Sequence, residues 1–210
     1  MTATVGIRND ERKPEMNEAR SATPEADGGL ESAIRADWGE SHTKDVTWND
    51  PATLAAGAGA LPGRQFLQAI IDGRLPPAPI ANLIGARLVS IDDGEAVFRC
   101  APDESTYNPI GMVHGGLLCT LLDSAAGCAV HTRLPAGAGY GTIEIKVSFL
   151  EPLHAGVGEI EIHGHALRVG GRVAFAEAHA RDARGRLVGH ATTSIAVIRP
   201  SAGQAIPPVS

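Results

Sequence analysis

The sequence GGLLCTLLDSAAGCAVHTR, at residues 115–133, decides the fold because it is the one long helical candidate in the body of the chain. Pro135 and Gly137 follow it and favour the end of a helix there. Asp123 is its only acidic side chain, and most of its other residues are apolar or small. A helix of this kind has to be covered on most of its sides. We therefore expect it to lie at the centre of a domain.

The residues on both sides of this helix alternate between apolar and polar with the period of two that is typical of strands. Before the helix, residues 84–91 and 95–101 flank the hairpin signal Asp92-Asp93-Gly94. After it come four predicted strands, at residues 142–149, 158–169, 173–181 and 187–198. Gly170-Gly171 predicts a tight hairpin between the second and third of these four.

The order of the elements predicts an α+β fold, in which an antiparallel sheet curls around the one long helix. One face of residues 173–181 consists of Ala174, Ala176, Ala178 and Ala180, which would let the helix approach closely. In residues 142–149 we expect Ile143, Ile145, Val147 and Phe149 on one face and Thr142, Glu144, Lys146 and Ser148 on the other. An open sheet also has edges, which a second copy of the chain could pair.

The remaining segments predict extensions of this domain. Residues 1–50 contain 11 acidic and 6 basic side chains with little periodicity and predict a largely flexible tail, which could dock from Trp38 onward. Residues 51–79 predict a helical extension in two pieces, broken near Leu61-Pro62-Gly63, followed by an extended proline-rich connector and a change to strands from Ile80. Residues 80–199 would form the domain, and residues 200–210 a flexible tail.

Composition excludes several classes of function. The formal net charge is −6, and the 160 residues after position 50 contain 13 acidic and 12 basic side chains, which argues against a nucleic-acid scaffold. The three cysteines, Cys100, Cys119 and Cys128, are an odd number without zinc-site spacing, so we expect free thiols and no metal. Neither a signal peptide nor a membrane-spanning run is apparent, so we expect a cytoplasmic protein without membrane insertion.

The chemistry is concentrated in the run YNPIGMVHGG at residues 107–116, where a loop becomes the long helix. Gly115 and Gly116 would let a substrate approach the backbone closely. The free N–H groups and the dipole of the helix start favour developing negative charge, as the oxyanion of a thioester requires. Asp123 is expensive to place in an apolar helix without a purpose, and it suits the role of a general base.

Helix geometry constrains how these groups can meet. His114 and Asp123 are nine residues apart, so in a regular helix they project about 180° apart and lie roughly 13 Å apart along the axis. They cannot serve one site within one chain, but two chains around a two-fold axis could each supply one half. The spacing therefore predicts a site at a dimer interface.

The combined motif is Asn108, Gly111, His114-Gly115-Gly116, Leu121-Leu122-Asp123, Thr142 and Gly171-Arg172. It resembles the PaaI-like (phenylacetate-degradation type) branch of the hotdog-fold acyl-CoA thioesterase family, over roughly residues 80–199. The resemblance implies a hotdog fold, a homodimer or dimer of dimers, and a small aromatic or medium-chain acyl-CoA substrate. It implies no cofactor, because CoA is part of the substrate.

The resemblance also implies roles for individual residues. Asp123 would be the general base or nucleophile, and the Gly116 N–H would hold the carbonyl oxygen. His114 and Asn108 would orient the thioester or, for Asn108, the attacking water. Thr142, from the facing subunit, would position water beside Asp123. Gly171 and Arg172 would lie near the CoA arm, with the arginine offering its charge to a phosphate.

Other interpretations of the same residues stay open. His114 could be a structural histidine, Asn108 a turn residue before Pro109, and Arg172 a solvated turn arginine. Two further functions are alternatives: hydration or dehydration of acyl thioesters, for which no second carboxylate is obvious, and a module that binds acyl-CoA without cleaving it.

Overall fold

The computed structural model describes residues 39–199, and the chain divides into two compact units, Met1–Thr43 and Lys44–Ser210. The predicted tail at 200–210, most of the predicted tail at 1–50, and Trp38 lie outside the described residues. The second unit contains every helix and strand described below.

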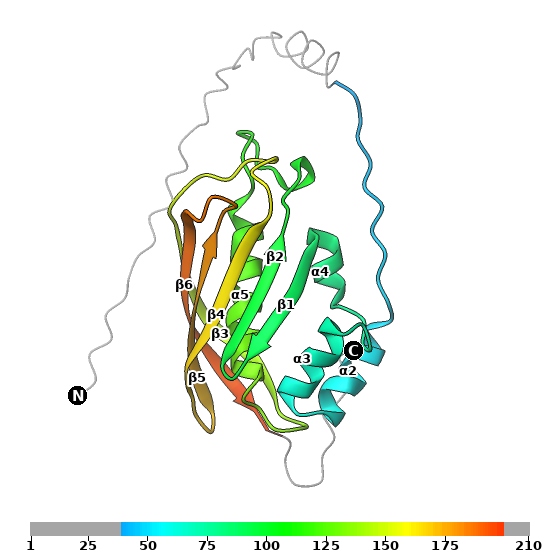
Figure 1. The fold of residues 1–210 in the computed structure, drawn as a ribbon, viewed down its shortest axis with the longest axis vertical. Coiled ribbons are helices and arrows are strands. Elements are labelled where there is room, and N and C mark those ends of the chain that lie inside the picture. The colour runs from blue at the N-terminus through cyan, green and yellow to red at the C-terminus, as the bar shows by residue number, and fades with distance from the viewer. Residues whose placement is uncertain (1–38, 200–210) are drawn as a thin grey trace, which may run out of the picture. The chain divides into compact units, whose positions relative to one another are not determined.

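The long helix and the six strands are the elements that the sequence predicts. The helix is α5 (Gly115–His131), and the strands are β1 (Ala86–Asp92), β2 (Glu95–Cys100), β3 (Gly139–Phe149), β4 (Ile160–Val169), β5 (Val173–Arg181) and β6 (Leu187–Ile198). All neighbouring pairs are antiparallel, in the order β1-β2-β4-β5-β6-β3. The sheet curves around α5 (Figure 1), which confirms the predicted architecture.

Small residues set the distance between α5 and the sheet. The alanines of β5 at positions 174, 176, 178 and 180 are at most 1% exposed, as their alternation predicts. On β4, a Cβ atom at Gly164 would lie 2.1 Å from the backbone oxygen of Ala125 in α5. The helix backbone therefore rests almost directly on the sheet at this point, and no larger residue fits there.

A β-bulge in β3 corrects the predicted alternation of that strand. The pairing with β6 shifts register between Thr142 and Glu144, and Ile143 in the bulge is 61% exposed. Ile145 and Val147 pack against the core beside α5, as predicted. Because a bulge inserts one residue, Thr142 lies on this same helix-facing side rather than on the opposite one, and Ile143 does not share the face of Ile145.

Three short helices precede the sheet, namely α2 (Pro51–Ala60), α3 (Gly63–Ile71) and α4 (Pro79–Ile84). The break between α2 and α3 falls at Leu61-Pro62, as the sequence predicts. The strand predicted from Ile80 is wrong, because Pro79 occupies the first turn of α4, where its missing N–H costs nothing. In Figure 1 the three helices lie together beside β1.

The chain before α2 has no helix or strand over residues 39–50. Polar contacts hold part of it to the domain: Lys44 Nζ is 2.7 Å from Asp103 Oδ2, and Asn82 Nδ2 donates to the backbone oxygen of Thr47. Trp48 is 63% exposed, so this contact does not depend on burial of its indole.

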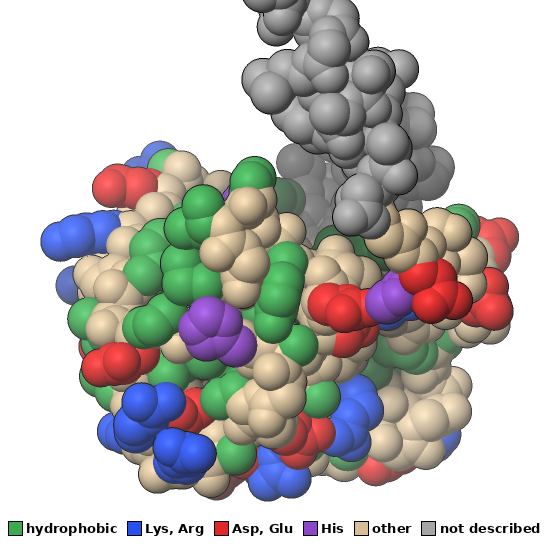
Figure 2. All heavy atoms as spheres, turned by 90° about the horizontal axis from the view of Figure 1, so that it is seen from above, with side chains coloured by type: hydrophobic (Ala, Val, Ile, Leu, Met, Phe, Trp, Pro, Cys, Tyr) green, Lys and Arg blue, Asp and Glu red, His purple; other side chains and the backbone are tan. Residues whose placement is uncertain are grey.

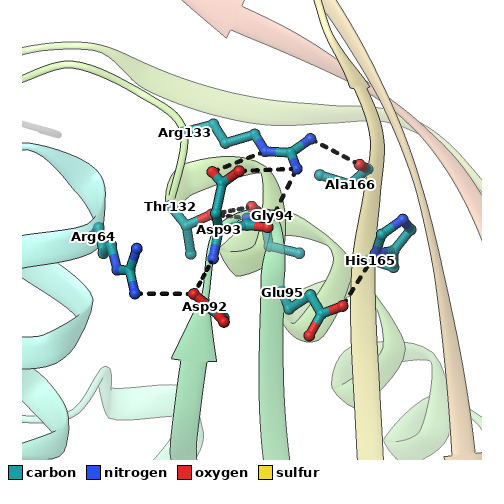
Figure 3. Close-up of polar contacts among 10 residues, drawn as sticks. Arg64, Asp92, Asp93, Gly94, Glu95, Thr132, Arg133, His165 and Ala166 are labelled. Carbon is teal, nitrogen blue, oxygen red and sulfur yellow. Dashed lines mark hydrogen bonds and ion pairs between the residues drawn. The ribbon is translucent and has the colours of Figure 1, made fainter.

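The C-terminal end of α5 is fixed to the β1–β2 hairpin (Figure 3). The N–H of Gly94, in the hairpin turn, donates to the Thr132 hydroxyl at 2.8 Å. The Arg133 guanidinium contacts the Asp93 carboxylate at 3.1 Å and donates to the backbone oxygen of Ala166 on β4. These bonds join the helix end to two neighbouring strands and therefore set its position on the sheet.

Candidate active site

The loop that leads into α5 is closed by its own backbone. Tyr107 and Val113 form an isolated antiparallel bridge, and the Asn108 N–H donates to the Met112 oxygen at 2.7 Å. Asn108 Oδ1 accepts from the N–H groups of Ile110 and Met112, both at 3.1 Å. The turn interpretation of Asn108 is thus correct for its oxygen, while its Nδ2 group has no partner among residues 39–199 and stays available to a substrate.

His114 is the N-cap of α5. Its Nδ1 accepts a hydrogen bond of 2.8 Å from the Gly116 N–H, and its side chain is exposed. An imidazole that accepts at Nδ1 and is neutral must have its proton on Nε2. The cap therefore fixes the tautomer in which Nε2–H is a donor.

The cap also determines which backbone donor is free. The Gly116 N–H, predicted to hold the carbonyl oxygen, is engaged by His114 in this structure. The Gly115 N–H, at the first position of the helix, has no hydrogen-bond partner within the described part of the chain. Two donors, Gly115 N–H and His114 Nε2–H, thus have no partner among residues 39–199 at the positive end of the α5 dipole.

Asp123 lies in the middle of α5, half-buried, on the side that faces β3. The Thr142 hydroxyl donates to Asp123 Oδ1 at 2.7 Å. This contact lies within one chain, whereas the sequence analysis expected Thr142 to approach Asp123 from a facing subunit. The β3 bulge is the reason, because it turns Thr142 toward the helix of its own chain.

The candidate residues thus form two groups at opposite ends of β3. At one end, the phenyl ring of Phe149 lies 3.0 Å from where a Cβ of Gly115 would be. At the other end, Thr142 is bonded to Asp123. Since α5 runs without a break from Gly115 to His131, the predicted separation of His114 from Asp123 holds within one chain.

Gly171 and Arg172 lie in the turn between β4 and β5. The register of the sheet aligns Val173, the next residue, with Ala196 and then with Gly141 on β3, so the turn is at the Thr142 end of the sheet. The backbone oxygen of Arg172 accepts from the Val197 N–H. Its guanidinium is exposed and makes no ion pair within residues 39–199.

The structure adds two aromatic residues that sequence reasoning missed, Phe149 beside Gly115 and Tyr140 beside Gly127. A Cβ at Gly127, one turn after Asp123, would lie 2.5 Å from the Tyr140 ring. The available signal was a glycine within a helix, which costs stability and so indicates a close approach. Burial raises the pKa of the neighbouring Cys128 thiol to about 12, so Cys128 is not a nucleophile near neutral pH.

Other site classes find no support in the described chain. Residues 39–199 contain no group of three or more His, Cys, Asp or Glu side chains placed to hold a metal ion. No helix within the same range has both the length and the apolar character needed to cross a membrane.

Comparison with known proteins identifies the family. The thioesterase superfamily profile matches residues 110–189. A Halobacterium salinarum protein that its name calls a candidate esterase is 32% identical over 114 residues, which are 52% of this chain and 74% of that protein. Human acyl-coenzyme A thioesterase 13 is 29% identical over 112 residues, 53% of this chain and 79% of that enzyme.

A solved structure supports the same assignment. A thioesterase candidate from Ralstonia eutropha, described as phenylacetic acid degradation-related, superposes with a TM-score of 0.57 and 26% identity, over 62% of this chain and 98% of that one. The fold and the family together define a hotdog-fold thioester hydrolase. The chain belongs to the thioesterase superfamily, and its similarity is to the PaaI-like branch.

Proposed function

We propose that this chain is an acyl-CoA thioesterase that hydrolyses small aromatic or medium-chain acyl-CoA. Two observations support this most directly. At the start of α5, the donors His114 Nε2–H and Gly115 N–H have no hydrogen-bond partner within the described residues. Further along the helix, Thr142 is hydrogen-bonded to Asp123. The name of the human relative, acyl-coenzyme A thioesterase 13, supports CoA as the thiol. Arg172, which is exposed and makes no ion pair in the described part of the chain, would offer charge to a CoA phosphate.

The two groups would form one site by pairing of β3 across a two-fold axis. Within the described chain β3 is an edge strand of the sheet, and an exposed edge presents unpaired backbone groups. Antiparallel pairing of β3 with the same strand of a second copy puts the start of one beside the end of the other. The partner subunit's Asp123 and the partner's Thr142 would then approach Phe149, Gly115 and His114.

In the proposed reaction the substrate carbonyl oxygen accepts from the Gly115 N–H, with Asn108 Nδ2 and His114 Nε2–H as further donors. Gly116 contributes by holding His114 in its tautomer, and becomes a second backbone donor only where its bond to His114 opens. Water that donates to the second carboxylate oxygen of Asp123 attacks the carbonyl carbon as Asp123 takes its proton. The C–S bond then breaks, and CoA leaves as a thiol with a proton returned by Asp123.

Asp123 as a nucleophile is the alternative chemistry, in which its carboxylate forms an anhydride with the acyl group that water then opens. Thr142 supports the general-base route, because its hydroxyl already donates to one oxygen of Asp123 while its own oxygen can accept a hydrogen bond from a water. A single turnover in ¹⁸O-labelled water tests for an anhydride that water opens at the carboxyl carbon of Asp123. Label only in the released acid is expected, whereas label in the Asp123 carboxylate would establish the anhydride.

The substitution Asp123→Asn tests the proposed base. It keeps the shape and a hydrogen-bond partner for Thr142 but removes the basic oxygen, so kcat should fall by about a thousandfold or more. Thiol release from acyl-CoA is the measurement, with circular dichroism as a control for folding. Hydrolysis at the wild-type rate would exclude Asp123 as the base.

Mixing two inactive variants tests whether the site is shared between subunits. Asp123→Asn and His114→Asn are refolded together from denaturant, so that mixed dimers form. Each mixed dimer has one intact site, and random pairing should restore about a quarter of wild-type activity. Recovery of none would mean that both groups act within one chain.

A further inference from the structure

A cleft of about 330 Å³ opens beside the start of α5. His114 and Gly115 form one wall, residues 149–153, from the last residue of β3 onward, form the other, and Leu118 lies one turn further along the helix. The lining is mostly apolar, including Phe149 and Leu150. Ligand pockets have this character, an apolar wall with a few placed polar groups, at volumes of roughly 300–1,000 Å³.

The surface around this cleft is also apolar. Figure 2 faces the end of the molecule at which the loops leading into α5 lie, and hydrophobic side chains gather there around a histidine. Among the exposed residues at this end, Ile110 is 75%, Phe149 57% and Leu150 48% accessible. This contiguous apolar patch lies beside the hydrogen-bond donors of His114 and Gly115, and the combination indicates a binding site.

A thioester bound at Gly115 has two arms of different chemistry. The CoA arm consists of amides, hydroxyls and phosphates and has to extend into solvent. The acyl arm is the apolar one. Since His114 and Gly115 are part of the cleft wall, a carbonyl held by them lies at the opening of the cleft, and the apolar arm suits its interior.

We infer that this cleft is the acyl subsite and that the Phe149 ring limits the length of the acyl chain it accepts. The inference rests on the proposed function. The volume, at the lower end of the range for ligand pockets, restricts the acyl group to short or medium chains or a single aromatic ring. The Phe149 ring packs directly against Gly115 and lines the cleft, so it fills volume that a longer acyl chain would otherwise use.

The one carboxylate in the lining, Glu151, adds a charge preference. It is exposed at the rim and makes no ion pair within residues 39–199. An acyl group with a terminal carboxylate would meet like charge there. The subsite therefore favours uncharged acyl groups over dicarboxylic ones.

A panel of acetyl-, butyryl-, hexanoyl-, decanoyl- and palmitoyl-CoA tests the subsite through relative kcat/KM. For the wild type, kcat/KM should rise roughly fourfold per methylene up to the chain length that fills the cleft and fall beyond it. Phe149→Ala should raise the ratio of decanoyl- to butyryl-CoA about tenfold. Glu151→Gln should raise the ratio of succinyl- to butyryl-CoA by a similar factor.

Phe175→Ala is the matched control, because Phe175 is also an exposed aromatic side chain but lines a different groove, between β5, β6 and β3. Its chain-length ratios should equal those of the wild type, and size-exclusion chromatography shows whether each variant keeps the wild-type assembly. If wild type hydrolyses the panel and Phe149→Ala leaves the ratio unchanged, the acyl subsite is wrong and the proposed function stands. If wild type releases CoA neither from any member of the panel nor from an aromatic thioester such as phenylacetyl-CoA, the proposed function fails and the subsite with it.

Discussion

At its C-terminal end, α5 has a donor for each of its last carbonyl oxygens, whereas at its N-terminal end a backbone donor is left over. Thr132 donates twice, from its N–H to the oxygen of Cys128 and from its hydroxyl to the oxygen of Ala129. The Arg133 N–H donates to the oxygen of Val130, and the Leu134 N–H donates to the oxygen of His131. The Gly115 N–H has no partner within residues 39–199. Within the described residues, the N-terminal end is therefore the one with a backbone donor that a ligand could use.

The surroundings of the two ends differ in the same sense. His131 is 6% exposed, between the rings of Phe66 and Tyr140, and Arg133 fastens the end of the helix to the hairpin (Figure 3). His114 is exposed beside an open cleft. One end of the helix is thus tightly packed, and under the proposed function the other end binds the substrate, so substitutions at the two ends should separate stability from activity.

The largest effect is expected from Gly63→Ala at the C-terminal end. Gly63, the first residue of α3, would place a Cβ 1.8 Å from the backbone oxygen of His131, which has no room to move. The free energy of unfolding should fall by about 3–4 kcal/mol, with kcat per folded molecule unchanged. Urea denaturation followed by circular dichroism measures the loss.

Gly59→Ala is the matched control for Gly63→Ala. It lies in α2, and no atom is within 4 Å of its Cβ position. Alanine should stabilise the helix there by up to about 1 kcal/mol. Equal unfolding midpoints for the two variants would contradict the tight packing of α3 on the end of α5.

The next largest effect is expected from acid, which should lower the stability of the folded chain through His131 at the C-terminal end of α5. Burial lowers the pKa of His131 to about 4 from an ordinary value of 6.5, so between these values the unfolded chain binds a proton that the folded chain does not. Stability is therefore lost as pH falls from 6.5 toward 4, by about 1.4 kcal/mol per unit and about 3 kcal/mol in all.

Comparison of the wild type with His131→Gln isolates this contribution, since glutamine does not titrate. The variant has a lower baseline stability, but its unfolding free energy should fall less steeply over the same pH window. Parallel pH profiles for the two proteins would show that another group accounts for the acid sensitivity.

Sequence reasoning succeeded where one local pattern decided the outcome. Alternation placed the alanine face of β5, and the run of apolar residues around Asp123 placed α5 in the core. Helix geometry separated His114 from Asp123 without any structure. These features depend on spacing along the chain alone, which the sequence contains.

Sequence reasoning failed where strand pairing or a side-chain hydrogen bond overrode the local pattern. The bulge at Ile143 depends on how β3 pairs with β6, so strict alternation put Thr142 on the wrong face. Pro79 was expected in an extended connector, yet proline also suits the first turn of a helix. The bond from Gly116 to His114 depends on a rotamer, which no spacing specifies.

The smallest effect on stability, with a clear effect on activity, is expected from His114→Asn at the N-terminal end. Asparagine is a good N-cap residue, so its Oδ1 can replace Nδ1 as the acceptor for the Gly116 N–H. The unfolding free energy should change by less than about 0.5 kcal/mol, whereas loss of the Nε2–H donor should lower kcat/KM about a hundredfold.

His114→Ala completes the comparison of the two ends, because it removes the cap and the donor together. It should lower kcat/KM by the same factor and also cost about 1 kcal/mol of stability. The difference in unfolding free energy between the two variants then measures the contribution of the cap. The loss of kcat/KM that they share measures the contribution of the Nε2–H donor. If His114→Asn keeps wild-type kcat/KM while His114→Ala loses it, the histidine acts only by holding Gly116, and the start of α5 is built for stability as its other end is.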